Sequence, residues 1–193
     1  ADLLATVAMP MASGVRLGTV ARDGTAVRMS ERLPQGWPRL APDGRRMARQ
    51  MIDPIRGNPD IWVEDLQDGS LVRVTRATGS DVLPVWSPDG RRLAYGSGTV
   101  KDRLLSIAAA DGTGGVQELP CPGPYCEPTD WSPDGSHLIV NTRPAISGVR
   151  GDVWSVSLER GGSTEVVLSG PFPEYDARIS PDSRWLAYVS EET

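Results

Sequence analysis

The sequence predicts an all-β protein, a β-propeller built from four-stranded antiparallel blades, and three observations support this. A ten-residue stretch at residues 86–95, WSPDGRRLAY, returns three more times with the same internal spacing. The prolines of the four copies lie at positions 42, 88, 133 and 181, and a repeat period of roughly 45 residues is typical of propeller blades. The chain also holds 21 glycines and 17 prolines without a low-complexity run, which favours many short strands joined by turns.

Each copy is centred on a tight turn. Ser-Pro-Asp-Gly suits a type I turn, because proline presets φ at the second position, aspartate suits the third and glycine accepts the last. Apolar residues precede the turn (Leu40, Trp86, Trp131, Ile179) and follow it (Met47, Leu93, Leu138, Leu186). Apolar runs on both sides of a tight turn indicate a β-hairpin. In the last copy Ser183 replaces the glycine, so we expect that turn to be strained or of another type.

The N-terminal residues 1–30 lack this turn. We expect a strand within residues 3–9 and a hairpin formed by residues 15–21 and 26–30. The pair Asp23-Gly24 between apolar runs is a strong hairpin signal.

The rest of the chain divides into repeats at about 36–80, 81–126 and 127–173, followed by a partial repeat at 174–193. We expect four strands in each full repeat and two in the last, all within a single propeller domain, or a fragment of one, that spans 1–193. The strands are predicted at 37–41, 46–51, 60–65, 71–75, 82–87, 92–97, 103–109, 116–119, 128–132, 137–142, 152–158, 164–168, 175–180 and 185–190.

A resemblance to a known family rests on these residues. Trp-Ser-Pro-Asp-Gly at 86–90 with a following apolar strand, together with Asp-Ile-Trp-Val at 60–63, resembles the WD40-like PD40 repeat of TolB-type β-propellers. The resemblance covers about residues 36–193 and implies the architecture. It does not imply one function, because propellers host many unrelated activities.

The family resemblance implies six blades, whereas this sequence holds three full repeats and a partial one. One alternative is a four-bladed ring in which the N-terminal hairpin supplies the outer strands of the last blade. The other is an incomplete six-bladed propeller, with the missing blades supplied by a larger parent chain or by a second copy in a homodimer. An open end would expose a strand edge, which proteins normally cover. We favour the incomplete six-bladed propeller.

Composition excludes several partner classes. The net charge of −5 argues against nucleic acid and against an anionic membrane surface. No apolar run approaches the roughly 20 residues of a membrane span, so we expect no membrane insertion. Residues 3–11 are apolar but no basic region precedes them, so no signal peptide is visible. A removed signal or an excised domain would look the same.

The two cysteines, Cys121 and Cys126, lie close together in CPGPYC. Either they close a small disulfide loop, which would imply an oxidising compartment, or they are two free thiols. The localisation therefore stays open, with a periplasmic or other extracytoplasmic compartment favoured over the cytoplasm. One cysteine pair and the single histidine are too few for a structural zinc site, so we expect neither a metal nor a cofactor.

Repeated residues are better explained by structure than by chemistry. Trp62, Trp86, Trp131 and Trp154 could stack a ligand, and Asp43, Asp89, Asp134 and Asp182 could hold metals. Equivalent slots in successive repeats instead favour core packing for the tryptophans and turn capping for the aspartates. His137 shares its slot with Arg46, Arg92 and Trp185, so we expect it on a strand surface. With no nucleophile elbow and no phosphate-binding loop, we expect no catalytic residue.

Strand alternation indicates a binding face. In antiparallel blades the Pro-Asp turns share one rim, and the longer connections at 31–35, 52–59, 76–81, 98–102, 120–127, 143–151 and 169–174 share the opposite rim, here called the long-loop rim. Long loops on a rigid scaffold commonly carry binding. The candidate binding residues on this rim are Arg56, Asn58, Asp81, Lys101, Glu127, Arg143, Arg150 and Tyr175.

These patterns predict a non-enzymatic protein or peptide interaction or sensor module that binds through the long-loop rim. The alternative is the substrate-gating propeller of a prolyl-oligopeptidase-like serine peptidase whose catalytic domain lies outside this sequence. A third hypothesis, a propeller enzyme that acts on sugars, requires paired carboxylates in the channel.

Overall fold

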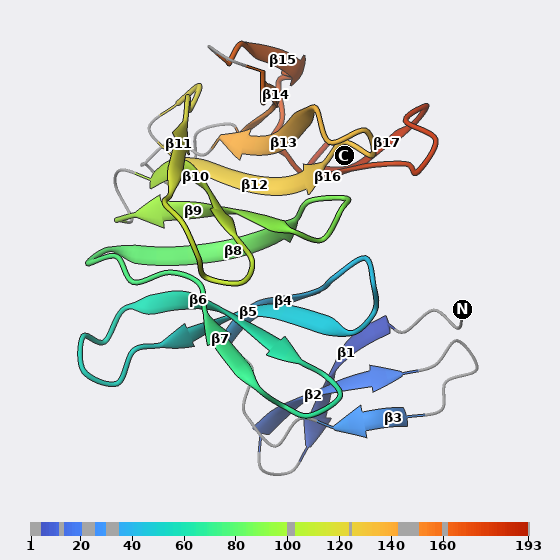
Figure 1. The fold of residues 1–193 in the computed structure, drawn as a ribbon. Helices are drawn as coiled ribbons and strands as arrows, with labels where there is room; N and C mark the ends of the chain where they lie inside the picture. Colours follow the sequence, from blue (N-terminus) through green and yellow to red (C-terminus); the bar gives the residue numbers. More distant parts are fainter. Residues whose placement is uncertain are drawn as a thin grey trace.

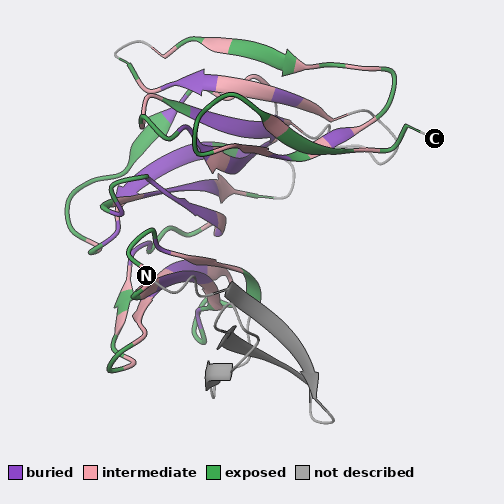
Figure 2. Ribbon diagram, turned by 90° about the vertical axis from the view of Figure 1, so that its right-hand side faces the viewer, coloured by how far each residue is buried: buried purple, intermediate pink, exposed green. Residues whose placement is uncertain are grey.

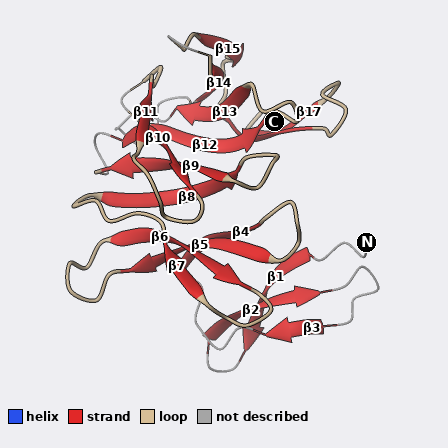
Figure 3. Ribbon diagram, in the orientation of Figure 1, coloured by secondary structure: helices blue, strands red, loops and turns tan. Residues whose placement is uncertain are grey.

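The computed structural model describes residues 5–11, 14–20, 26–29, 35–99, 103–123, 125–142, 151–159 and 162–192. The elements in these residues are strands, and none is a helix (Figure 3). The strands are β1 (Ala5–Met11), β2 (Gly14–Val20), β3 (Ala26–Met29), β4 (Gln35–Leu40), β5 (Arg46–Ile52), β6 (Pro59–Asp65), β7 (Leu71–Arg73), β8 (Ser80–Trp86), β9 (Arg92–Gly98), β10 (Arg103–Ala109), β11 (Gln117–Leu119), β12 (Cys126–Trp131), β13 (His137–Thr142), β14 (Asp152–Ser157), β15 (Thr164–Leu168), β16 (Glu174–Ile179) and β17 (Leu186–Ser190).

Hydrogen bonding groups the strands into consecutive antiparallel sheets. β4–β7, β8–β11 and β12–β15 form four-stranded sheets in chain order, and β16 pairs with β17. The first strands of these sheets pack side by side, β4 against β8, β8 against β12 and β12 against β16. The sheets follow one another in chain order (Figure 1). This arrangement confirms the all-β propeller fold that the repeats predict.

The N-terminal strands form a sheet of their own. β1, β2 and β3 pair in that order, and β1 lies against β4. Within the described part of the chain they do not pair with β16 or β17. The alternative in which they complete the last blade of a four-bladed ring is therefore wrong for these residues. The predicted turn at 21–25 lies outside the described residues, and blades supplied by a parent chain or a second copy stay a prediction.

The Pro-Asp turns have the local chemistry expected of them. In the three copies with serine, the hydroxyl donates to the aspartate, for example Ser132 Oγ to Asp134 Oδ1 at 2.6 Å. The same hydroxyl accepts the N–H that opens the next strand, that of His137 at 2.9 Å. Gly135 has a φ of +76°, and Ser183 is forced into the same left-handed region at +57°. The turn-capping role of the aspartates and the strain at Ser183 are confirmed.

The core lies between neighbouring sheets. Trp86 packs with Ile61 and Tyr95 between the first two four-stranded sheets, and Trp131 packs with Leu105 between the second and third. Trp154 is partly buried against the second cluster, and Trp62 is half-buried. The core assignment therefore holds for Trp86 and Trp131 and in part for the other two. Buried residues concentrate in these sheets, whereas β17 is largely exposed (Figure 2).

Candidate functional site

The first strand of each blade is interrupted by a β-bulge. Strand pairing shifts between Gln35 and Arg39, between Val82 and Val85, between Pro128 and Asp130, and between Tyr175 and Arg178. A bulge changes the direction in which a side chain points, and bulges are common next to functional sites. Here they fall at equivalent positions of successive repeats, about five residues before the turn proline.

Two of these bulges hold non-glycine residues in the left-handed region. Leu83 has a φ of +57° and Asp176 a φ of +53°, a conformation that costs roughly 1–3 kcal/mol for such residues. The neighbouring blade helps to hold Leu83, because its N–H donates to Gln50 Oε1 at 3.1 Å. The backbone at Leu83 is therefore held by a hydrogen bond from the neighbouring blade.

The bulges open onto a cavity of about 420 Å³ between the first strands. We call it the channel cavity. Its lining residues are Trp37 and Arg39 from β4, Leu83 from β8, Glu127, Pro128 and Thr129 from β12, Asn141 from β13, and Asp176 and Arg178 from β16. Three of these, Trp37, Leu83 and Pro128, present apolar surface. Concave sites with apolar walls and a few polar groups are typical of ligand binding.

Two arginines face this cavity from the first and last of the four strands. Arg39 and Arg178 are both half-buried. Burial, followed by the charge of Arg178, lowers the pKa of Arg39, and the carboxylates of Asp176 and Asp130 offset this only in part. Burial is therefore the main reason that the charged form of Arg39 is disfavoured, and the charge of Arg178 is the second.

The other polar groups of the wall differ in whether they are already paired. Glu127 Oε1 accepts from Arg103 Nη1 at 3.3 Å, and the Thr129 hydroxyl donates to the Ile139 oxygen at 3.2 Å. Asn141 is only 2% exposed, and its Oδ1 has no hydrogen-bond partner among the described residues. Leaving a buried acceptor unpaired costs about 1–3 kcal/mol, so its position at a cavity favours a hydrogen-bonding ligand there.

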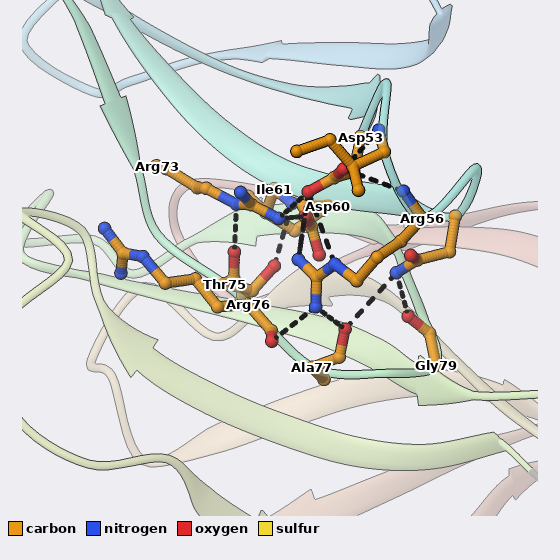
Figure 4. A network of polar contacts seen from close by, with 11 residues as sticks. Asp53, Arg56, Asp60, Ile61, Arg73, Thr75, Arg76, Ala77 and Gly79 are labelled. Carbon is orange, nitrogen blue, oxygen red and sulfur yellow. Dashed lines mark hydrogen bonds and ion pairs between the residues drawn. The ribbon is translucent and has the colours of Figure 1, made fainter.

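Two long-loop candidates, Arg56 and Asn58, belong to a network that ties two connections together. Figure 4 shows Arg56 within this network. Arg56 Nη1 donates to the backbone oxygens of Arg76 and Ala77, each at 2.8 Å. Asn58 Nδ2 donates to the oxygens of Gly79 at 2.5 Å and Ala77 at 3.3 Å. These side chains therefore fasten the 52–59 connection to the segment that enters β8.

Two buried carboxylates anchor this network. Asp60 is fully buried and Asp53 is 5% exposed, and Arg73 Nη2 forms ion pairs with both. The backbone N–H groups of Arg56 and Ile55, with smaller contributions from the arginines, hold the pKa of Asp53 well below its usual range. The network explains why this long connection has a defined shape.

The remaining long-loop candidates are scattered. Asp81 is fully buried, accepts from Ser97 Oγ at 2.6 Å and has its pKa raised by burial. Glu127 lies in the wall of the channel cavity, and Tyr175 is half-buried on β16. Lys101, Arg143 and Arg150 lie outside the described residues. Of the members of this set that the structure describes, only Glu127 lines the cavity, and a binding role for the whole set stays a prediction.

Sequence reasoning missed the residues that line the channel cavity with Glu127. Most of these residues come from two positions of the repeat. One position holds Trp37, Pro128 and Asp176, and the other holds Arg39, Asp130 and Arg178. Alignment of the four repeats would have shown that these slots vary while the flanking turn does not. That variation was the available signal. Positions that pack between blades keep the same residue type from repeat to repeat, whereas positions that face a ligand need not.

Other features of the structure bear on the sequence predictions. Cys121 and Cys126 form a disulfide with a Cα–Cα distance of 5.9 Å, so the disulfide loop holds and the alternative of two free thiols does not.

Among the described residues, no three His, Cys, Asp or Glu side chains gather in a way that could hold a metal ion. No helix in the same residues is long and apolar enough to cross a membrane.

Comparison with known proteins identifies the family. The model of the TolB β-propeller domain, PD40, matches residues 15–193. The chain belongs to the TolB β-propeller domain family. The solved structure of a putative TolB from Agrobacterium tumefaciens is similar to this TolB-type propeller with a TM-score of 0.75 and 20% identity, over 98% of this chain and 71% of that one. TolB from Acinetobacter baumannii is similar with a TM-score of 0.60 and 19% identity, over 99% of this chain and 55% of that one.

Curated relatives of this TolB-type propeller have different names. An "Uncharacterized peptidase YuxL" of Bacillus subtilis (strain 168) is 28% identical over 81% of this chain and 29% of its own length. The "WD repeat-containing protein SL1-17" of Schistosoma mansoni is 29% identical over 68% of this chain and 40% of its own length. The chain thus spans well under half the length of either relative.

Proposed function

We propose that this chain is a non-catalytic binding module that takes a peptide segment of a protein partner into the channel cavity. The single observation that supports this most directly is the composition of the cavity wall. Apolar surface from Trp37, Leu83 and Pro128 stands beside an unpaired buried amide oxygen on Asn141. A peptide offers the matching groups, namely apolar side chains and backbone N–H donors.

The long-loop rim would form the entrance to this site. Glu127 and Asn141 face each other as paired residues of β12 and β13 at the ends of these strands nearest the long loops. The fastened connection around Arg56 and Asn58 would then provide a rigid border, and rigid surfaces reduce the entropy lost on binding.

The test is to select peptides against the chain from a random display library and to measure their affinity by fluorescence anisotropy. Trp37→Ala should weaken binding at least tenfold, because Trp37 borders the cavity and is 70% exposed. Trp185→Ala is the matched control, since Trp185 is 69% exposed and is not among the residues that line the cavity. Binding that depends on Trp185 and not on Trp37 would refute the assignment of the cavity.

A second candidate function is the propeller of a peptidase whose catalytic domain lies outside this chain. It is favoured by the relative named a peptidase and by a prolyl endopeptidase structure that is similar with a TM-score of 0.57 and 14% identity, over 80% of this chain and 26% of that one. The full reading frame that encodes this chain distinguishes the peptidase propeller from a sensor module. A downstream α/β-hydrolase segment with a Gly-x-Ser-x-Gly elbow supports the peptidase, whereas an upstream kinase domain supports a sensor module.

A further inference from the structure

We propose that Arg39 and Arg178 form a carboxylate-binding pair, so that the peptide taken by the channel cavity is an acidic one. This inference rests on the proposed peptide-binding function and adds the chemical class of the ligand. The two arginines come from β4 and β16, line the same cavity and act on each other electrostatically. Arginine binds carboxylates through two parallel N–H···O bonds, and one carboxylate placed between two guanidinium groups would accept from both.

Two of the acidic residues near this pair are engaged in other contacts. Asp130 already accepts two backbone N–H groups, from Trp131 at 3.0 Å and from Ile179 at 2.7 Å. Glu127 is paired with Arg103. Asp176 is the further carboxylate in the wall, and it faces two arginines. Beyond the Glu127–Arg103 pair, the lining therefore holds two arginines and one aspartate, with Asp130 close by. Each guanidinium has five N–H donors, so a ligand carboxylate can be accepted beside these acids.

The state of Arg39 supports the same conclusion independently. Its pKa is lowered although Asp176 and Asp130 both act to raise it, because burial and the charge of Arg178 outweigh them. Burial disfavours the charged form of Arg39 first, and the charge of Arg178 does so second. An ionisable group perturbed in this way at a cavity is a candidate for a functional site.

Asn141 adds a second contact of the right kind. It is 2% exposed, lines the cavity and has an unpaired Oδ1. An unpaired acceptor can receive a peptide N–H while the guanidinium groups hold the carboxylate. A simple inorganic anion offers no such donor, so the pairing of groups favours a peptide acid.

The first test needs no peptide. Thermal unfolding of the 193-residue chain is followed with glutarate, with neutral glutaramide and with sodium chloride at equal ionic strength. Glutarate at ten times its Kd stabilises by about 1.4 kcal/mol and should raise Tm by about 3–6 °C, and the other two should not. The increase should vanish in Arg39→Gln and Arg178→Gln and persist in Arg45→Gln, which changes an exposed arginine of the first Pro-Asp turn.

A merely structural role for Arg39 predicts a different result. If Arg39 served packing, Arg39→Gln would lower the Tm of the ligand-free chain. Our proposal expects this Tm to be unchanged or higher, because the variant removes repulsion with Arg178, and function-related sites commonly cost stability. Arg39→Lys, which keeps the charge without the planar fork, should retain part of the response to glutarate. An equal response to glutarate in wild type and both glutamine variants overturns the proposal.

The second test identifies the source of the carboxylate. Three dye-labelled peptides with one shared core are compared. The first has uncharged side chains and a free C-terminal carboxylate. The second has an amidated C-terminus and an internal Asp-Glu pair, and the third has an amidated C-terminus and uncharged side chains. At least one of the two carboxylate-bearing peptides should bind about tenfold more tightly than the uncharged amidated peptide. If the first peptide does so, the ligand carboxylate is a C-terminus, and if the second does so, it is an acidic side chain.

The outcomes separate the two proposals. Equal binding of all three peptides overturns the carboxylate pair and leaves peptide binding intact. A glutarate response that depends on Arg39, with no peptide bound at all, supports the carboxylate pair and refutes the proposed peptide function.

Discussion

The guanidinium of Arg46 in β5 lies over the indole of Trp86 in β8, 5.0 Å from the ring centroid. Arg46 Nη2 also donates to the Gly90 oxygen at 2.8 Å. Arg92 repeats the stacking over Trp131 in the next blade, also at 5.0 Å. Arg46, Arg92 and the exposed His137 occupy the same position in successive repeats. Where this position holds arginine, its side chain therefore joins consecutive blades.

Replacement of Arg46 should loosen the contact between the first two four-stranded sheets. Arg46→Ala removes the cation–π contact, the hydrogen bond to Gly90 and a partly exposed ion pair with Asp43, so we expect a loss of about 1–2 kcal/mol in the free energy of unfolding. Urea unfolding measures it, with Arg45→Ala, a neighbouring exposed arginine, as control. Equal losses in the two variants would mean that the stacking adds nothing.

The two buried turn tryptophans should differ in their cost of replacement. Trp86 Nε1 donates to the Arg39 oxygen at 2.9 Å, whereas Trp131 Nε1 has no partner among the described residues. Both side chains are largely buried, so the area lost on mutation to phenylalanine is comparable. Trp86→Phe should therefore cost about 1 kcal/mol more than Trp131→Phe. Chemical unfolding of both variants tests this, and the reverse order would contradict it.

Acid should weaken the chain partly through the Pro-Asp turns. The Ser132 hydroxyl, followed by the Ser136 backbone N–H, lowers the pKa of Asp134 to about 2. Since the unfolded value is near 3.9, the native state binds this proton less readily. The stabilisation is therefore complete above about pH 4 and is lost as the pH falls towards 2.

Unfolding measured between pH 5 and pH 2 checks the role of Asp134. Asp134→Asn should be less stable than wild type at neutral pH, and the difference should shrink towards pH 2. Ser132→Ala removes the largest cause of the shift and should likewise flatten the pH dependence. A difference between wild type and Asp134→Asn that stays constant over this range would rule out the linkage.

The network of Figure 4 should depend more on Arg73 than on Arg56. Both arginines form ion pairs with Asp53 and the fully buried Asp60, but the side chain of Arg73 is 22% exposed against 32% for Arg56. Arg73 also lies over the indole of Trp62. Removal of a partner from a buried ion pair costs up to about 3–5 kcal/mol, and the arginine that remains limits this loss. Arg73→Ala should therefore cost more than Arg56→Ala, with both losses below that range. Thermal or urea unfolding of the two variants decides, and equal losses would contradict the ranking.

Much of the blade structure was predictable because it is decided locally. The strand predicted at 92–97 is observed as β9 (Arg92–Gly98), and the one predicted at 103–109 as β10 (Arg103–Ala109). Alternating side chains and the Ser-Pro-Asp-Gly turn are properties of a few adjacent residues, so they can be read in one sequence. The placement of the tryptophans between blades followed from their repetition.

The candidate site was not predictable in the same way. Arg39 and Arg178 are far apart in the chain and share the channel cavity only because β4, β8, β12 and β16 pack side by side. The long-loop prediction placed Arg56 and Asn58 at a rim, but their donors are used for contacts within the chain. Nothing in the local pattern says whether a loop arginine meets solvent, a ligand or a backbone oxygen.

The sequence by itself determined the repeat, the turn at each Pro-Asp pair and the four-stranded blade, because these depend on backbone sterics and alternating burial over short distances. Only the tertiary structure decided which sheet the N-terminal strands join, how the bulges at Leu83 and Asp176 turn towards a cavity, and which charges meet there. These features depend on how successive blades pack against one another, and that packing joins residues whose proximity no local pattern encodes.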